Sequence, residues 1–296
     1  MNPKHIILTL LLMLCPIGMA AQSTITRHKP KPAVTKPKPA AKPKAKPAPR
    51  RNSTHHSSST SSTVSLSAEL NKLINNMVYV SSGTFTMGAT SEQGSDAESD
   101  EKPTHSVTLS SYYICKYEVT QALWRAVMGS NPSNFKGDNL PVELVSWDDC
   151  QTFINRLNSY TGRNFRLPTE AEWEFAARGG NYSRHYKYSG SNYISDVAWY
   201  DGNSGNRTHP VGTKQANELG LYDMSGNVYE WCSDGYGSYS SYSQNDPTGP
   251  NSGSRRVPRG GSWRNNAKYC RSSCRANYAP GDRGYYLGLR LVLSHL

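Results

Sequence analysis

The chain of 296 residues lacks the motifs of several large enzyme classes. It has no Gly-rich loop that would cradle phosphate and no His-Glu-x-x-His pair that would hold zinc. His105, His185, His209 and His295 show no metal-ligand spacing, and no motif marks a Ser/His/Asp arrangement. These absences give no support for phosphate-binding, zinc-peptidase or serine-hydrolase chemistry.

A hydrophobic run long enough to cross a bilayer comfortably is also missing. Lys4 and His5 precede a short apolar run at residues 6–15, and Gly18-Met-Ala20 provides small residues for cleavage. This pattern predicts a cleaved signal peptide over residues 1–20, with no transmembrane helix after its removal. Leu14 directly before Cys15 argues against a lipoprotein. We therefore expect a secreted or periplasmic protein.

Residues 22–51 contain no acidic side chain but carry ten Lys or Arg. Without these and Lys4, the chain has 22 basic residues against 22 Asp and Glu, from totals of 33 and 22. The globular part is thus neutral, which argues against a nucleic-acid partner. Residues 21–65, with Lys-Pro repeats followed by a Ser-rich stretch, are typical of a disordered linker. An alternative role is adhesion to an anionic surface such as lipid or polymer.

Local sequence signals predict a domain of mixed α and β structure. Helix starts are marked by Thr120, by Ser146 with Asp149, and by the capping box of Thr169 with Glu172. Alternation of apolar and polar residues predicts strands, and an acidic, Gly/Ser-rich stretch predicts a surface loop. We expect helices at 67–76, 121–128, 147–160 and 170–178, strands within 77–88, 106–113 and 287–293, and the surface loop at 90–104. Little helical periodicity follows Gly180, so bound cations or disulfides are expected to support the loops.

Five cysteines remain after signal cleavage: Cys115, Cys150, Cys232, Cys270 and Cys274. In an oxidising compartment, an odd number leaves at least one thiol free, paired between chains, or bound to metal. The connectivity cannot be determined from the sequence. For Cys270 we consider burial or a disulfide with Cys232 or another cysteine.

Two groups of acidic residues allow more than one interpretation. Asp223, Asn227 and Glu230 lie four and three residues apart, which suits either a turn with surface acids or a site for Ca²⁺, a cation that prefers oxygen ligands. Glu170, Glu172 and Glu174 are interpreted as helix-capping and surface charges. Glu118 is expected to have a packing or pairing role.

Three motifs occur in order within about a hundred residues. They are Arg166-Leu-Pro-Thr-Glu-Ala-Glu-Trp-Glu-Phe, Gly220-Leu-Tyr-Asp-Met-Ser-Gly-Asn-Val-Tyr-Glu-Trp and Arg259-Gly-Gly-Ser-Trp. Together they resemble the domain of formylglycine-generating (sulfatase-modifying) enzymes. The resemblance covers residues 77–296 of a domain expected at 66–296. It implies an α+β fold related to C-type lectins, with little regular secondary structure and support from Ca²⁺.

The resemblance also implies functional residues. In the family, the segment that matches residues 221–231 supplies a structural Ca²⁺ site, here Asp223, Gly226, Asn227 and Glu230, with Asp223 in place of an asparagine. The Gly-Gly-Ser segment is followed by two cysteines that bind Cu⁺ and, with oxygen, oxidise a substrate cysteine. This implies a catalytic group of Ser262, Tyr269 and Cys270.

One position departs from the family's pattern. Asn265 stands where the first copper-binding cysteine is expected, and an amide cannot replace a thiolate as a Cu⁺ ligand. Cys274 lies four residues after Cys270 instead of five before it, so it is a poor substitute.

These observations favour a catalytically divergent module that binds an unknown protein or peptide in the cell envelope, with the basic tail as a tether. The alternative is a copper- and oxygen-dependent oxidase that converts a cysteine or serine of a sulfatase to formylglycine. A third reading, an oxidoreductase that assists non-haem iron enzymes, lacks the histidine-bearing domain it would need.

Overall fold

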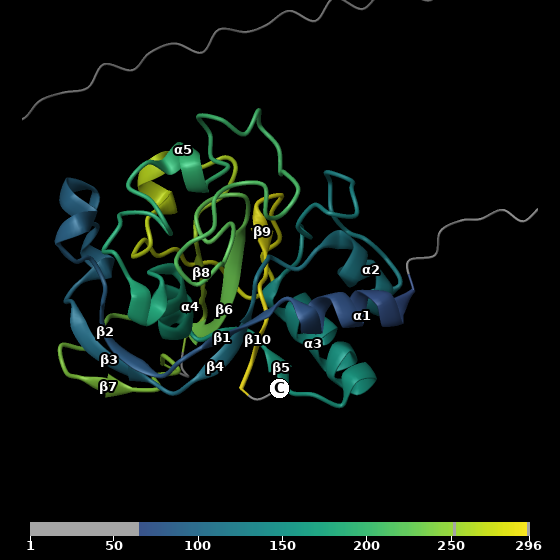
Figure 1. Ribbon diagram of the computed structural model, residues 1–296, viewed down its shortest axis with the longest axis horizontal. Helices are drawn as coiled ribbons and strands as arrows, with labels where there is room; N and C mark the ends of the chain where they lie inside the picture. The colour runs from purple at the N-terminus through teal and green to yellow at the C-terminus, as the bar shows by residue number, and fades with distance from the viewer. Residues whose placement is uncertain (1–64, 251–252, 295–296) are drawn as a thin grey trace, which may run out of the picture. The chain divides into compact units, whose positions relative to one another are not determined.

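The computed structural model describes residues 65–250 and 253–294. The predicted signal peptide and almost all of the predicted linker lie outside these residues. Short strands and helices alternate with long connections, as expected for an α+β fold with little regular structure (Figure 1). The elements are α1 Leu66–Asn75, β1 Met77–Val80, β2 Gly83–Met87, η1 Ser91–Asp96, η2 Ser99–Glu101, β3 His105–Leu109, β4 Tyr112–Cys115, α2 Gln121–Met128, α3 Trp147–Thr161, β5 Phe165–Arg166, α4 Glu170–Ala177, η3 Gly180–Tyr182, α5 Ile194–Val197, β6 Tyr229–Gly235, β7 Gln244–Asn245, β8 Arg256–Arg259, η4 Ala267–Cys270, β9 Leu287–Gly288 and β10 Val292–Leu293.

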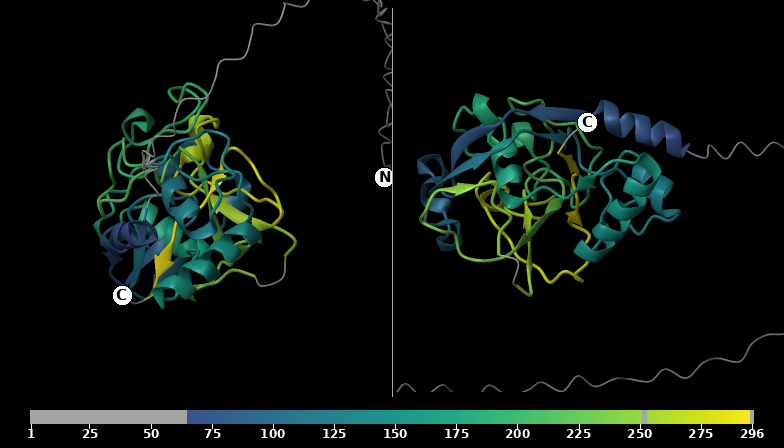
Figure 2. Two further views of the ribbon diagram at one scale, coloured as in Figure 1. Left: turned by 90° about the vertical axis from the view of Figure 1, so that its right-hand side faces the viewer. Right: turned by 90° about the horizontal axis from the view of Figure 1, so that it is seen from below.

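The strands form three small sheets, with orders β1-β4-β10-β5, β2-β3-β7 and β8-β6-β9. Most pairs are antiparallel, whereas β3 with β7 and β6 with β9 are parallel. Helices α1, α2 and α3 lie on one side of the domain, and the sheet of β2, β3 and β7 lies on the other (Figures 1 and 2). Within the described residues, no helix has the length and hydrophobicity needed to cross a membrane.

The helix starts read from the sequence are confirmed by their caps. The Thr120 hydroxyl accepts a hydrogen bond from the Leu123 amide at the start of α2. Ser146 and Thr169 each form a reciprocal capping box, with Asp149 and Glu172 respectively. A cap involves residues only three apart and satisfies amides that the helix leaves unpaired, so the sequence alone specifies it.

Two predicted strands are each divided between two sheets. The strand expected at 106–113 is broken at Ser110 and Ser111, so that β3 pairs with β2 while β4 pairs with β1 and β10. The strand expected at 287–293 is likewise split into β9 and β10, which belong to different sheets. Arg290 lies between them and turns into the protein interior, where its guanidinium group is fully buried.

Two predictions of surface position are wrong. The acidic stretch at 90–104 forms the 3₁₀ turns η1 and η2, and its Glu101 is fully buried against Arg271, with a shortest N–O distance of 2.5 Å. Glu170 and Glu174 are also buried, because both carboxylates accept hydrogen bonds from Arg259. Buried carboxylates need such partners to offset the loss of hydration.

The five cysteines of the domain are buried and free of disulfides. The alternative of a disulfide between Cys270 and Cys232 is therefore wrong, and the alternative of burial is confirmed for Cys270. Cys232 packs with the core around Trp173 and Met224, whereas Cys270 packs with Val197 beneath α5. Apolar packing takes the place of the disulfides expected to hold the loops.

Burial of Glu143 gives a testable pH dependence. Its Oε1 accepts a hydrogen bond from the Phe135 amide, its Oε2 has no partner among the described residues, and burial raises its pKa from 4.5 to about 7. Folding then favours the neutral form, so the group destabilises the fold increasingly as the pH rises from 4.5 through 7. We expect Glu143→Gln to have little effect at pH 5 but to stabilise the protein by about 1–3 kcal/mol at pH 8.

The measurement is the free energy of unfolding in urea at both pH values. Glu218→Gln, at a half-buried position, serves as the matched control. Equal effects of Glu143→Gln at pH 5 and pH 8 would show that Glu143 ionises normally.

Candidate functional site

The predicted catalytic residues lie together in the connection that follows β8. Gly260 and Gly261 both have positive φ, at 95° and 73°. A β-carbon on Gly261 would lie 2.6 Å from the Cys270 sulfur, so the backbone approaches the thiol closely only because residue 261 is glycine. In Figure 1 the turn η4, which ends at Cys270, lies next to α5.

Ser262 and Asn265 bind each other instead of a ligand. The buried Ser262 hydroxyl donates a hydrogen bond to the side-chain oxygen of Asn265. The Asn265 backbone carbonyl in turn accepts from the amide of Asp201. The position that resembles the first copper-binding cysteine is therefore held by neutral polar contacts.

The thiol of Cys270 is in an unreactive environment. Cys270 is fully buried, and burial raises the pKa of its thiol well above the ordinary value. Burial also raises the pKa of Cys274, to about 12. Because the thiolate is the nucleophile and the metal ligand, both groups are poor in the form that would react. Tyr269 is half-buried, and its ring lies beneath the Lys268 ammonium group at 4.5 Å.

This group does not fit the family's Cu⁺ centre. A soft cuprous ion is held by two thiolates, whereas Cys270 is accompanied by the amide of Asn265 at the matching position. We therefore derive no oxidative step from Ser262, Tyr269 and Cys270.

The predicted calcium residues lie directly against the Cys270 region. Gly226 has a φ of 83°, and its amide donates to the Gly260 carbonyl at 2.8 Å. A β-carbon there would lie 2.4 Å from the Trp199 carbonyl oxygen, so only glycine fits. The Ser225 hydroxyl donates to the carbonyl of Cys270 at 2.8 Å. The two motifs are therefore parts of one packed region, a proximity that the sequence does not reveal.

Glu230 is paired with an arginine. Its carboxylate accepts from Arg290 Nη2 at 2.6 Å and Nε at 2.9 Å, and from Trp173 Nε1 at 2.7 Å. Both charged side chains are fully buried. In this arrangement Glu230 does not fit as a cation ligand, because its two oxygens already bind a positive charge.

Asp223 and Asn227 are arranged differently. Asp223 Oδ2 accepts from the Gly212 amide at 2.7 Å, while its buried Oδ1 has no partner among the described residues. The amide group of Asn227 donates to Glu118 Oε2 at 2.6 Å. Burial raises the pKa of Asp223 to about 6 and that of Glu118 well above its ordinary value.

Only part of the predicted calcium set is therefore available for a cation. Over residues 65–250 and 253–294, no group of three or more His, Cys, Asp and Glu side chains is arranged to hold a metal ion. The unpartnered Oδ1 of Asp223 and nearby backbone carbonyls are compatible with oxygen ligation. The predicted calcium site stays a prediction.

Sequence reasoning missed the buried arginines that surround this region. Arg259, Arg271 and Arg290 are fully buried, and Arg275 is nearly so. Arg275 binds Glu170 with Nε at 2.6 Å and Nη2 at 2.8 Å, a bidentate pair. These partners lie more than a hundred residues apart in the sequence, so no local spacing signals the network.

Comparison with known proteins agrees with the α+β fold and the three motifs, which define a domain of the formylglycine-generating type. The sequence matches the family described as "Sulfatase-modifying factor enzyme 1-like domain" over residues 63–295, and the chain belongs to this family. The chain is 38% identical to chaperone protein LppX of Paenibacillus barcinonensis over 238 residues, which cover 64% of this chain and 82% of that protein. It is 29% identical to the formylglycine-generating enzyme of Mus musculus over 294 residues, which cover 75% and 76% of the two chains.

Two solved structures are similar. Treponema denticola variable protein 1 has 36% sequence identity and a TM-score of 0.67, with 74% of this chain and 95% of that chain covered. PvdO from Pseudomonas aeruginosa has 29% identity and a TM-score of 0.66, with 74% and 94% covered.

Proposed function

We propose that this chain is a catalytically divergent member of its family that acts as a binding or assembly module in the cell envelope. The observation that carries the proposal is the pair of Asn265 and Cys270. An amide stands at the first copper-binding position, and the remaining thiol is fully buried with a raised pKa. A similar protein named as a chaperone, LppX, supports a role in handling another protein.

The predicted location and partners follow from the sequence. The signal peptide at 1–20 supports a secreted or periplasmic protein, and the basic segment of the linker would act as a tether to an anionic surface. The partner is proposed to be a protein or peptide, and Ca²⁺ is proposed as a structural ion bound around Asp223. The alternative function is the copper-dependent oxidation of a sulfatase cysteine or serine.

Coexpression with a sulfatase separates the two functions. A sulfatase with a cysteine at its modification site would be produced with this chain, with its Cys270→Ser variant, or alone, in a host that does not modify the sulfatase. We expect equal, background levels of sulfatase activity and of formylglycine in all three samples, measured by peptide mass spectrometry. Activation that requires Cys270 would contradict the proposal and support the oxidase.

A further inference from the structure

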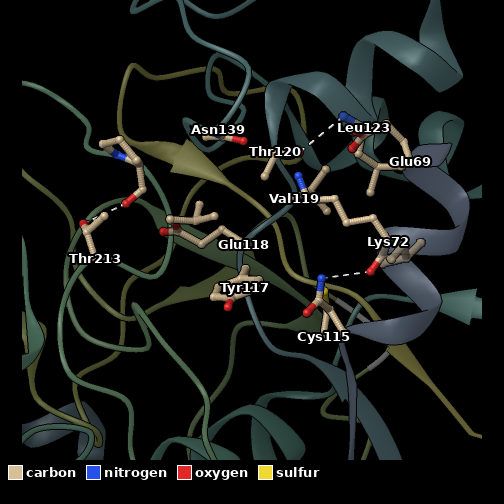
Figure 3. A pocket seen from close by; sticks show the side chains of 14 residues that line it. Glu69, Lys72, Cys115, Tyr117, Glu118, Val119, Thr120, Leu123, Asn139 and Thr213 are labelled. Carbon is tan, nitrogen blue, oxygen red and sulfur yellow. Dashed lines mark hydrogen bonds between the residues drawn. The ribbon is translucent and has the colours of Figure 1, made fainter. Parts of the chain in front are cut away.

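A cavity of about 360 Å³ lies between α1, α2 and the connection that carries Glu118. Figure 3 shows Glu69 and Lys72 on α1, and Glu118 on the segment between β4 and α2, with the cavity between them. Much of the remaining lining is apolar and includes Leu73, Val119, Leu123 and Val211. Cavities of this size and character are typical of small-molecule sites.

The carboxyl groups in this cavity differ from most others buried in the protein. Five buried glutamates form ion pairs with arginines; they are Glu101, Glu170, Glu172, Glu174 and Glu230. Glu69 and Glu118 are 9% and 2% exposed, yet neither has a Lys, Arg or His within ion-pair distance among the described residues. Both line this one cavity.

Glu118 has hydrogen-bond donors but no positive charge. Its Oε1 accepts from the Val228 amide at 3.0 Å and its Oε2 from Asn227 at 2.6 Å. No side-chain hydrogen bond is formed by Glu69 within the described part of the chain. The one cationic side chain that lines the cavity, Lys72, is exposed, so its charge remains solvated at the rim. The interior of the cavity is therefore acidic, and a cation inside it would compensate the buried carboxyl groups.

The chemistry of the walls indicates which kind of cation. A calcium ion requires six to eight oxygen ligands, whereas this lining is mainly aliphatic. An ammonium group on an apolar body matches both features, since its hydrogens bind carboxylates and its hydrocarbon part replaces water in the cavity. Tyr117 also lines the cavity and provides an aromatic ring, a group that attracts ammonium ions.

We propose that this cavity binds a small primary amine with an apolar or aromatic body, with the ammonium group held by Glu69 and Glu118. The site is independent of the region around Cys270. It provides the protein with a ligand whose presence fixes α1, the helix that directly follows the linker, against α2.

Isothermal calorimetry with matched probes tests the proposal. The full mature chain, in buffer with EGTA, is titrated with 2-phenylethylamine and with 2-phenylethanol, which has the same skeleton but no charge. We expect saturable binding of the amine, at least about tenfold tighter than that of the alcohol. If neither probe binds up to its solubility limit, or if both bind equally, the proposal is wrong.

Variants separate a ligand-binding role of Glu69 from a structural one. Glu69→Gln should weaken amine binding by about tenfold and leave alcohol binding unchanged, since only the charge is lost. Lys72→Gln should strengthen amine binding about twofold by removing a like charge. Val211→Trp should fill the cavity and abolish binding of both probes, and Glu218→Gln is the matched control. Equal amine affinities for Glu69→Gln and Glu218→Gln would overturn the proposal, as would saturation by CaCl₂ in EGTA-free buffer that depends on Glu69 while the amine fails to bind.

Discussion

Asn265→Cys is expected to convert a protein with negligible copper affinity into one that binds a single Cu⁺ ion tightly. The variant would place a second thiol in the position that matches the family's first copper ligand, beside the free thiol of Cys270. Two thiolates are a favourable ligand set for this soft ion, whereas one thiol and one amide are not. We expect the affinity for Cu⁺ to increase by several orders of magnitude over the wild-type protein.

The gain should also depend on pH. The metal binds the thiolate, and burial raises the pKa of the Cys270 thiol, so binding must release its proton. The apparent affinity of the variant should therefore increase as the pH rises. Competition with a Cu⁺ chelator at pH 6.5 and 8.5 gives both values.

Two controls accompany the measurement. Asn265→Ser changes the same position without adding a thiol, and Asn265→Cys combined with Cys270→Ala removes the second ligand. Neither should bind copper. An Asn265→Cys protein that behaves like Asn265→Ser would show that the side chains at 265 and 270 do not meet in the way that the family resemblance implies.

Separation of the Glu230–Arg290 pair is expected to cause the largest loss of stability. Both groups are fully buried, and the Arg290 guanidinium also donates to the carbonyls of Cys115 and Tyr222. Glu230→Gln leaves the arginine charge buried without its counter-ion, and Arg290→Met leaves the carboxylate in the same state. Each should lower the free energy of unfolding by about 3–5 kcal/mol. The double variant should lose less than the sum of the two single losses.

The exposed pair of Arg125 and Asp138 provides the control. Their side chains are 38% and 55% exposed, so Asp138→Asn should cost less than about 1 kcal/mol. A loss of that small size for Glu230→Gln would contradict the structural role assigned to the buried pair.

The same variants test the predicted calcium site. If Ca²⁺ binds the folded protein, it raises the melting temperature by mass action. The structure leads us to expect that any such effect persists in Glu230→Gln, because Glu230 binds Arg290, and is lost in Asp223→Asn, whose Oδ1 is free. Loss of the calcium effect in Glu230→Gln but not in Asp223→Asn would show that the carboxylate of Glu230 leaves Arg290 to bind the ion.

The features predicted correctly from the sequence are those with a local cause. Thr120, Ser146 and Thr169 were recognised as helix caps because capping involves neighbouring residues. The family was recognised from three motifs, and these also identify Gly226 and Gly261, two positions where only glycine allows the close contacts observed.

The features predicted incorrectly depend on distant partners. Glu101 was read as part of a surface loop because its acidic, Ser-rich neighbours are typical of one, and the partner that buries it, Arg271, is 170 residues away. Glu170 and Glu174 were read as surface charges for the same reason. The division of the strand at 106–113 was missed because alternation continues through Ser110 and Ser111, and it shows only that side chains alternate, not which sheet each half joins.

The candidate site was predicted in its residues but not in its assembly. The sequence gave no indication that Ser225 and Gly226 contact Cys270 and Gly260, or that Glu118 binds Asn227. These contacts join segments brought together only by the complete fold. The cavity beside Glu118 was likewise invisible, because its two carboxyl groups come from a helix and a connection that share no motif.

The most direct test of catalytic divergence is a turnover measurement with the purified, reduced wild-type protein. It would be supplied with Cu⁺, oxygen and a cysteine-containing sulfatase peptide, and the aldehyde product would be trapped with a hydrazide and quantified by mass spectrometry. A known formylglycine-generating enzyme serves as the positive control. We predict no aldehyde above the level of a protein-free sample. Repeated turnover that is abolished by Cys270→Ser would contradict the account and establish this chain as an oxidase.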